Sequence, residues 1–180
     1  MTPHDIVRFW AEEVGEKRWF EPDLELDADI ARRFGESCAL ASDGKLPDWE
    51  NSAEGALALL ILLDQLPRNM FRGKAEAFAT DAKARAIADR AVARGFDLQV
   101  LQTLRPFFYL PFMHSEHCED QDRCVALIAE RVGKDSENYP YALAHRDAIA
   151  KFGRFPGRNV ALGRQSTPEE LEFLNSHPPF

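Results

Sequence analysis

The sequence lacks an excess of basic residues, and it also lacks a long apolar run. Its 22 Lys and Arg are outnumbered by 30 Asp and Glu, which gives a formal net charge of -8. Nucleic-acid and anionic-membrane surfaces rely on basic excess, so this charge balance argues against both partners. The longest apolar run, from Ala56 to Leu63, is far too short to span a bilayer. Asp5 falls where a secretory signal would be basic and then apolar, so we expect no export.

Paired cysteines and strand patterns are missing as well. The three cysteines, Cys38, Cys118 and Cys124, are odd in number and lack CxxC spacing. This excludes a disulfide scaffold and predicts reduced thiols in a cytoplasmic protein. Alternating apolar and polar residues are nearly absent, which argues against a sheet. We therefore predict an all-α protein without a cofactor.

Helical periodicity and helix-capping residues are present along the whole chain. At 180 residues and 45% hydrophobic content, the chain can bury a core of its own, which predicts a single domain over residues 1–180 with about eight helices. Thr2, Asp27, Thr80, Ser115 and Thr167 are the predicted N-caps. The predicted helices cover roughly residues 3–14, 27–43, 55–66, 80–94, 97–104, 115–132, 137–152 and 167–174.

The segment from Gly55 to Gly73 joins the most apolar run to a dense set of polar groups. Leu57 and residues 59–63 are apolar around the whole helix, which predicts a helix buried on every side. Because Pro67 lacks a donor and clashes with the preceding turn, we expect the helix to break near Leu66. The break should expose Arg68, Asn69 and Arg72 next to a buried Asp64.

A second apolar segment, RPFFYLPF at residues 105–112, has a proline near each end. The prolines limit it to a short helical or irregular piece. Its rings cannot face water together without forming a large apolar patch. We predict an interior plug in which Phe107, Phe108 and Phe112 are buried.

The first polar motif lies at residues 64–72 and has two interpretations. Arg68 and Arg72 are four residues apart, so on a helix they point the same way and can hold an anion with Gln65 and Asn69. Alternatively, Asp64 neutralises an arginine in a structural network that ties helices together, since buried charges are paired with or without a ligand. The sequence alone leaves both open.

The second motif is the stretch FGRFPGRNVALGR at residues 152–164. It places Arg154, Arg158 and Arg164 among glycines and a proline, a loop whose backbone can approach a ligand. Asn159 follows Arg158 much as Asn69 follows Arg68, and the shared role would be donation to carbonyls or to an anionic group. A solvated basic loop is the simpler alternative.

The third motif contains His114, Glu116, His117, Asp120 and, further along, His145. Imidazole and carboxylate groups suit proton transfer near neutral pH, and they also suit divalent metals. The spacing is not HExxH, so we predict no metal site. His145 shares its helix face with apolar residues, which makes a hydrogen-bonded core histidine an alternative to a ligand-binding one.

Several motifs in order, LLDQLPRNMFRG, AFATDAKA, FFYLPFMHSE with Gln121, KFGRFPGRN, LGR and TPEE, resemble the bacterial DUF924 family. The resemblance spans nearly the whole chain. It implies an all-α, tetratricopeptide-repeat-like superhelix and no established activity. Gly157 departs from the family pattern, where a histidine is expected, and Met113 stands where an acidic residue looks commoner. Any chemistry that relatives perform with those side chains is absent here.

Three function hypotheses follow. The first is a cytoplasmic protein that binds a small phosphate- or carboxylate-bearing ligand through Arg68, Arg72, Arg154 and Arg158. In this hypothesis Asp64, Glu116 and His114 orient the ligand or move protons, so hydrolysis is left open.

The second hypothesis is a helical module that binds a peptide or protein partner through Trp19, Phe20, Trp49 and the arginines. The third makes the arginines and carboxylates an internal brace. Whether the protein is an enzyme or a homo-oligomer stays open.

Overall fold

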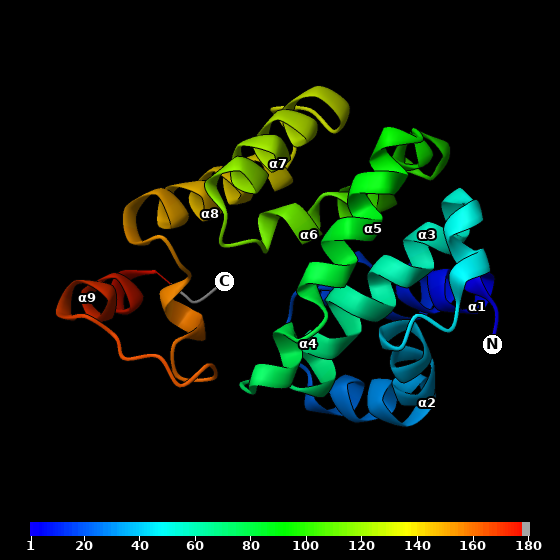
Figure 1. Ribbon diagram of the computed structural model, residues 1–180, viewed down its shortest axis with the longest axis horizontal. Helices are drawn as coiled ribbons and strands as arrows, with labels where there is room; N and C mark the ends of the chain where they lie inside the picture. The colour runs from blue at the N-terminus through cyan, green and yellow to red at the C-terminus, as the bar shows by residue number, and fades with distance from the viewer. Residues whose placement is uncertain (178–180) are drawn as a thin grey trace. The chain divides into compact units, whose positions relative to one another are not determined.

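The computed structural model describes residues 1–177, and their regular structure is entirely helical (Figure 1). The predicted all-α class is confirmed for these residues, which contain no strand. Their α-helices are α1 (Pro3–Arg8), α2 (Leu24–Ser42), α3 (Ala53–Leu60), α4 (Leu66–Met70), α5 (Asp81–Ala93), α6 (Leu110–Met113), α7 (Cys118–Arg131), α8 (Asn138–Phe152) and α9 (Pro168–Ser176).

The chain groups into two compact units. The first contains Met1–Arg72 and Glu76–Pro111, and the second contains Gly73–Ala75 and the chain from Phe112 onward. The single domain and the tetratricopeptide-repeat-like superhelix stay predictions. Among residues 1–177, no helix combines the length and apolar character that crossing a membrane requires.

The apolar run of α3 forms the centre of the first unit, as predicted. Leu57 is 1% exposed, and Ile61, Leu62 and Leu63 are completely buried. Helices α1 and α5 pack against α3, while α2 packs against α4 and the π-helical turn Ile61–Gln65. This turn joins α3 directly to α4, so the apolar core continues into the polar residues that follow it.

The predicted break before Pro67 is wrong, because the chain stays helical through to Met70. Pro67 lies in the first turn of α4, where a missing N–H is tolerated, and the wider π-helical turn precedes it. Proline cannot donate to the carbonyl of Leu63 four residues earlier, and that carbonyl accepts a hydrogen bond of 2.5 Å from Thr80 Oγ1. Thr80 holds the N-cap position of α5, but its side chain caps no helix amide.

The predicted cap at Asp27 is also wrong. Helix α2 begins at Leu24, because the side chain of Asp23 accepts hydrogen bonds from the amides of Glu25 and Leu26. Asp27 lies one turn further into α2, and its carboxylate binds Asn69 and Arg72. Both aspartates suit a helix start, and tertiary contacts decide which of them caps it.

The aromatic plug is confirmed. Phe107, Phe108 and Phe112 are 2%, 0% and 1% exposed. The 3-10 helix Gln102–Phe108 and α6 carry the segment. In the first unit, the Phe107 ring meets Trp19 edge-on at a centroid distance of 4.8 Å.

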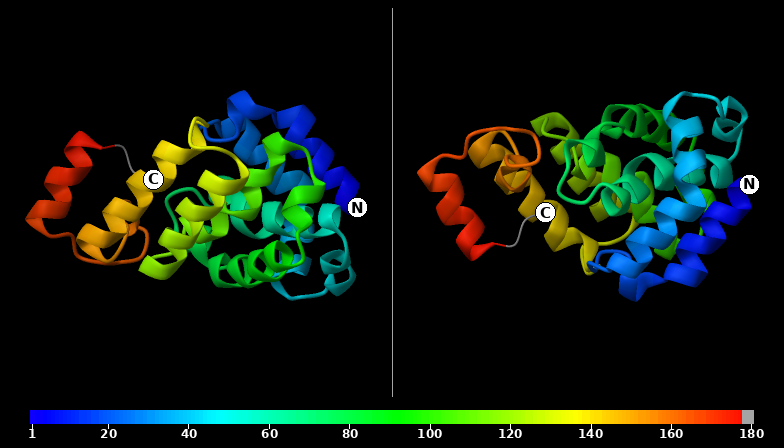
Figure 2. Two further views of the ribbon diagram at one scale, coloured as in Figure 1. Left: turned by 90° about the horizontal axis from the view of Figure 1, so that it is seen from above. Right: turned by 90° about the horizontal axis from the view of Figure 1, so that it is seen from below.

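The second unit contains the paired helices α7 and α8, which run side by side, and α9, shown in red in Figure 2. Thr167 and Glu170 form the predicted capping box at the start of α9. The predicted cap at Ser115 is wrong, because α7 begins at Cys118 with His117 at its N-cap position. The Ser115 hydroxyl donates to Asp120 and accepts from the His117 amide, which holds the turn before α7.

Candidate functional site

The predicted site residues fall into two clusters, one in each unit, and each cluster is described with its own unit. We call the first the α4 cluster and the second the loop cluster. The α4 cluster comprises Asp27, Asp64, Gln65, Arg68, Asn69, Arg72 and Asp81. The loop cluster comprises His114, Glu116, His145, Arg154, Arg158, Asn159, Arg164 and Glu170. The predicted catalytic set is divided between them, since Asp64 belongs to the first unit and His114 and Glu116 to the second.

Asp64 is buried and faces Arg68, as predicted. Its side chain is 1% exposed and accepts from Gln65 Nε2 at 2.6 Å, while Arg68 Nη1 lies 3.4 Å from Oδ1. Arg68 Nη1 also donates to the Asp64 carbonyl at 2.6 Å. The Arg68 guanidinium forms a two-pronged pair with Asp81, at 2.9 and 3.0 Å. Arg68 therefore fastens the end of the central helix to α5.

The Asp27 carboxylate accepts hydrogen bonds from the other two donor residues of the α4 cluster, Arg72 and Asn69. Arg72 Nε and Nη2 donate to its two oxygens at 2.8 and 2.9 Å, and Asn69 Nδ2 donates at 2.8 Å. These bonds tie α2 to α4. The expected exposure holds for Arg72 but not for Arg68, whose side chain is 21% exposed. Asn69 is only 7% exposed because it turns toward Asp27.

In the loop cluster, the Glu116 carboxylate accepts hydrogen bonds from residues of the loop that follows α8. It accepts from Arg164 Nη1 and Nη2 at 2.7 and 3.0 Å and from the Phe155 amide at 2.8 Å. Burial raises the pKa of Glu116, but the hydrogen bonds from Arg164 and Phe155 and the charge of Arg158 outweigh burial and lower it below its ordinary value. Glu116 is therefore held as an acceptor, which suits positioning better than proton transfer.

Glu170 is the second acceptor of the loop cluster, and the sequence marked it only as part of a capping box. It accepts from Arg154 Nε and Nη2 at 2.7 and 2.9 Å, from the Thr167 amide at 2.8 Å and from Asn159 Nδ2 at 3.2 Å. Hydrogen bonds from Arg154 lower its pKa most, and the pKa is about 2. The cap of α9 thus also anchors the loop.

Arg158 lies beside the two histidines. Its side chain is largely buried at 8% exposure, its Nη2 donates to the His114 carbonyl at 2.8 Å, and its guanidinium lies 4.6 Å from the Phe155 ring centroid. The His114 and His145 ring centroids are 6.4 Å apart. His145 Nδ1 lies 2.8 Å from the Tyr141 carbonyl, and because a carbonyl only accepts, Nδ1 is the donor in this bond.

The short sequence similarity between the two motifs corresponds to a shared hydrogen-bond pattern. Arg68 and Arg158 each donate to a backbone carbonyl. Asn69 and Asn159 each donate to a carboxylate that also receives Nε and Nη2 of an arginine. The anionic group that the motif was predicted to bind is, in both clusters, at least partly the chain's own carboxylate.

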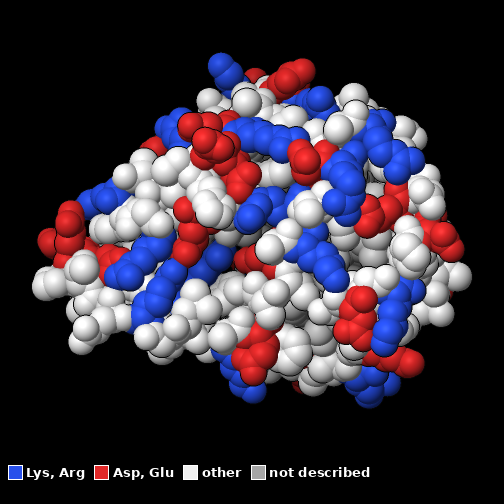
Figure 3. Space-filling model, viewed as in Figure 1, with Lys and Arg blue, Asp and Glu red and all other residues white. Residues whose placement is uncertain are grey.

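In the α4 cluster, carboxylates outnumber arginines, so the cluster offers no surplus of positive charge to an anion. Asp27 and Asp81 join Asp64, so three carboxylates face two arginines. In the loop cluster the named residues retain one more positive than negative charge, with three arginines and two glutamates. On the face drawn in Figure 3, basic and acidic side chains are interspersed.

The remaining candidates, His117 and Asp120, are not members of either cluster. His117 is exposed, and Asp120 accepts from Ser115. In the part of the chain that the structure describes, no group of three His, Cys, Asp or Glu side chains could hold a metal ion. All three cysteines are thiols, and burial raises the pKa of Cys38 and of Cys124 to about 12.

The fold and the clusters define an all-helical protein in which arginine–carboxylate pairs fasten helices and loops. The chain belongs to the DUF924 family, described as bacterial proteins of unknown function, and the family profile matches residues 6–177. It is similar to a solved protein of unknown function from Agrobacterium tumefaciens, with 42% identity, 97% coverage of each chain and a TM-score of 0.92. A search of curated proteins found no match.

Proposed function

We propose that the protein binds a small phosphate- or carboxylate-bearing ligand at the loop cluster, with Arg158 as the principal contact and His114 and His145 beside it. The observation that carries the proposal is the grouping of a buried guanidinium with two imidazole rings: Arg158 is 8% exposed, and the His114 and His145 ring centroids are 6.4 Å apart. Glu116 accepts from Arg164 and also experiences the charge of Arg158, so this carboxylate interacts with two guanidiniums of the cluster. A guanidinium stays charged and offers several donors, so Arg158 suits a phosphate or carboxylate group.

The α4 cluster has no part in this binding function and acts as a brace. Its carboxylates outnumber its arginines, and the bidentate pairs with Asp27 and Asp81 link separate helices. Within the loop cluster, the pairs of Glu170 with Arg154 and of Glu116 with Arg164 hold the loop that presents Arg158 and Asn159. The lowered pKa of Glu116 does not support a role for this carboxylate in proton transfer. The catalytic roles of His114 and Asp64 stay predictions.

Thermal unfolding in the presence of inorganic phosphate or malonate tests the proposal, with sodium chloride at matched ionic strength as the control. A ligand at a hundred times its dissociation constant adds about 2.7 kcal/mol, which raises the midpoint by roughly 5–11 °C for a chain of this size. Arg158→Gln should remove the rise. Arg146→Gln, which alters a half-buried arginine paired with the exposed Asp147, should leave it intact.

Two outcomes contradict the proposal. If no anion raises the midpoint beyond the chloride control, the loop cluster binds none of these ligands. If Arg158→Gln unfolds the protein, Arg158 is a structural brace like the other arginines.

The second candidate function, a peptide or protein interaction module, is favoured by one feature of the first unit. Phe20 is 63% exposed and Leu24 81% exposed, and Phe20 lies against Trp19 and Phe107 with centroid distances of 6.4 and 6.5 Å. A large apolar side chain on a packed aromatic base is a typical contact for a partner protein. This function becomes the leading one if the anion experiment fails.

A further inference from the structure

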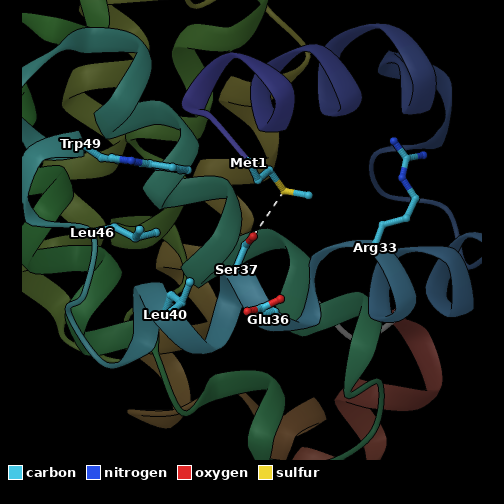
Figure 4. Close-up of a pocket in the computed structure, with 7 residues that line it drawn as sticks. All are labelled: Met1, Arg33, Glu36, Ser37, Leu40, Leu46 and Trp49. Carbon is cyan, nitrogen blue, oxygen red and sulfur yellow. Dashed lines mark hydrogen bonds between the residues drawn. The ribbon is translucent and has the colours of Figure 1, made fainter.

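The first unit contains a hollow of about 290 Å³ that none of the predicted catalytic or ligand-binding residues lines. It lies beside α2 and the 3-10 helix Pro47–Asn51, and Figure 4 shows its walls. The lining residues are Met1, Arg33, Glu36, Ser37, Leu40, Leu46 and Trp49. Its volume is near the lower end of the range for ligand pockets, so it suits a small ligand or one side chain of a partner.

One wall of the hollow is apolar and is held in place. Leu40 and Leu46 lie near the half-buried ring of Trp49, which extends toward Met1 (Figure 4). Gly55 fixes this arrangement, because a Cβ atom there would lie 2.1 Å from the Trp49 carbonyl oxygen. The close approach of the two backbones therefore requires glycine and sets the position of the tryptophan.

The polar wall of the hollow carries the Glu36 carboxylate, which has no hydrogen-bonded or ion-paired partner among the described residues 1–177. The Glu36 side chain is exposed. The charge of Arg33 is compensated, because its Nη1 lies 2.7 Å from Glu13 and 3.2 Å from Asp29. Its guanidinium also lies over the Phe9 ring, 4.5 Å from the centroid. The Glu36 carboxylate is therefore the group that a ligand in this hollow would neutralise.

We propose that this hollow binds an alkylammonium group, with the apolar chain against Leu40, Leu46 and Trp49 and the cation at Glu36. A carboxylate and an indole face both attract an ammonium ion, and the tryptophan ring also accepts its methylene groups. The ammonium belongs either to a free amine or to a lysine side chain of a peptide. The proposal is independent of the anion site in the second unit.

The test is a titration of the intact protein followed by the indole N–H resonance of Trp49, assigned with Trp49→Phe. The probes are n-pentylamine, its neutral analogue n-pentanol, and a capped Leu-Lys-Leu peptide. We expect n-pentylamine to bind at least tenfold more tightly than n-pentanol and to shift the Trp49 resonance. Tighter binding of the peptide than of the amine would assign the ammonium to a partner's lysine, and the reverse order would assign it to a free amine.

Glu36→Gln should raise the dissociation constant for n-pentylamine at least tenfold and leave that for n-pentanol unchanged. Glu25→Gln is the matched control, because Glu25 is also an exposed glutamate of α2 but does not line this hollow. An unchanged spectrum elsewhere shows that each variant is folded. Equal binding of amine and alcohol, or equal effects of the two substitutions, would overturn the proposal.

Discussion

Glu170→Gln is the most direct test of how the loop cluster is held together. The Glu170 side chain is 3% exposed and accepts two hydrogen bonds from Arg154, one from the Thr167 amide and one from Asn159. Glutamine has nearly the same volume, and its carbonyl can still accept from Thr167. The substitution therefore removes the negative charge and one acceptor while preserving the packing.

The expected magnitude follows from the pKa of Glu170, which falls from an ordinary value of 4.5 to about 2. A pKa change of this size corresponds to about 3 kcal/mol of folding free energy. Arg154 is 29% exposed, and solvent screens part of the pair, so we expect Glu170→Gln to lower the free energy of unfolding by about 2–3 kcal/mol at pH 7.

The pH dependence has a definite sign. Because the folded-state pKa is below the unfolded-state value, the ionised carboxylate stabilises the fold fully above pH 5, and this contribution declines as the pH falls toward 2. At pH 3 the difference between wild type and Glu170→Gln should fall to roughly half or less of its value at pH 7.

Urea unfolding followed by circular dichroism at both pH values measures the two differences, and amide exchange of residues 153–176 locates them. Glu169→Gln is the control, because Glu169 precedes Glu170 in α9 but pairs with Lys151 where both side chains are more than half exposed. Such a surface pair contributes about 0–1 kcal/mol. Equal effects of the two substitutions at pH 7, or no change between pH 7 and pH 3, would refute the assigned role of Glu170.

Two further predictions concern the first unit. Thr80→Val should destabilise the protein by roughly 1–3 kcal/mol, because it removes the hydroxyl that donates to the Leu63 carbonyl, whereas Thr80→Ser should retain most of the stability in the same urea titration. Phe108→Ala should cost about 3–5 kcal/mol, because the ring is completely buried, and a loss below about 1 kcal/mol in urea unfolding would show that the plug is not part of the core.

Features that depend on neighbouring residues were predictable from the sequence. The capping boxes at Thr2 and Thr167 each require only a partner three residues away, and both form. The apolar run of α3 and the aromatic plug had to be buried because no arrangement could expose them together in water. Local sequence therefore predicted the helical class and most of the core.

Features that depend on residues far apart in the sequence could not be predicted from the local sequence. Asp23 and Asp27 are equally plausible helix caps in sequence, and the choice follows from Arg72, which is 45 residues from Asp27. The helix continues past Pro67 because a π-helical turn precedes it and because Thr80, 17 residues from Leu63, donates to the Leu63 carbonyl. Neither contact has a sequence pattern of its own.

The candidate site was predictable in its residues but not in its charge balance. Arg68 and Arg72 were expected to face one anion because they are four residues apart, yet they bind different carboxylates. Asp81 lies on α5, and its negative charge was invisible to a count taken within the motif. A motif identifies which donors are present, whereas the fold decides which acceptors reach them.

The two clusters show that residue type alone does not distinguish a ligand site from a brace. Both use an asparagine and an arginine on one carboxylate and a second arginine on a backbone carbonyl. Among their named residues, the α4 cluster has two arginines and three carboxylates, whereas the loop cluster has three arginines and two carboxylates. Where carboxylates outnumber arginines, an added anion would meet repulsion and displace existing pairs. Where arginines outnumber carboxylates, an anion lowers the repulsion among cations that cannot lose their protons. The binding proposal therefore depends on Arg158 and not on the arginine motif as such.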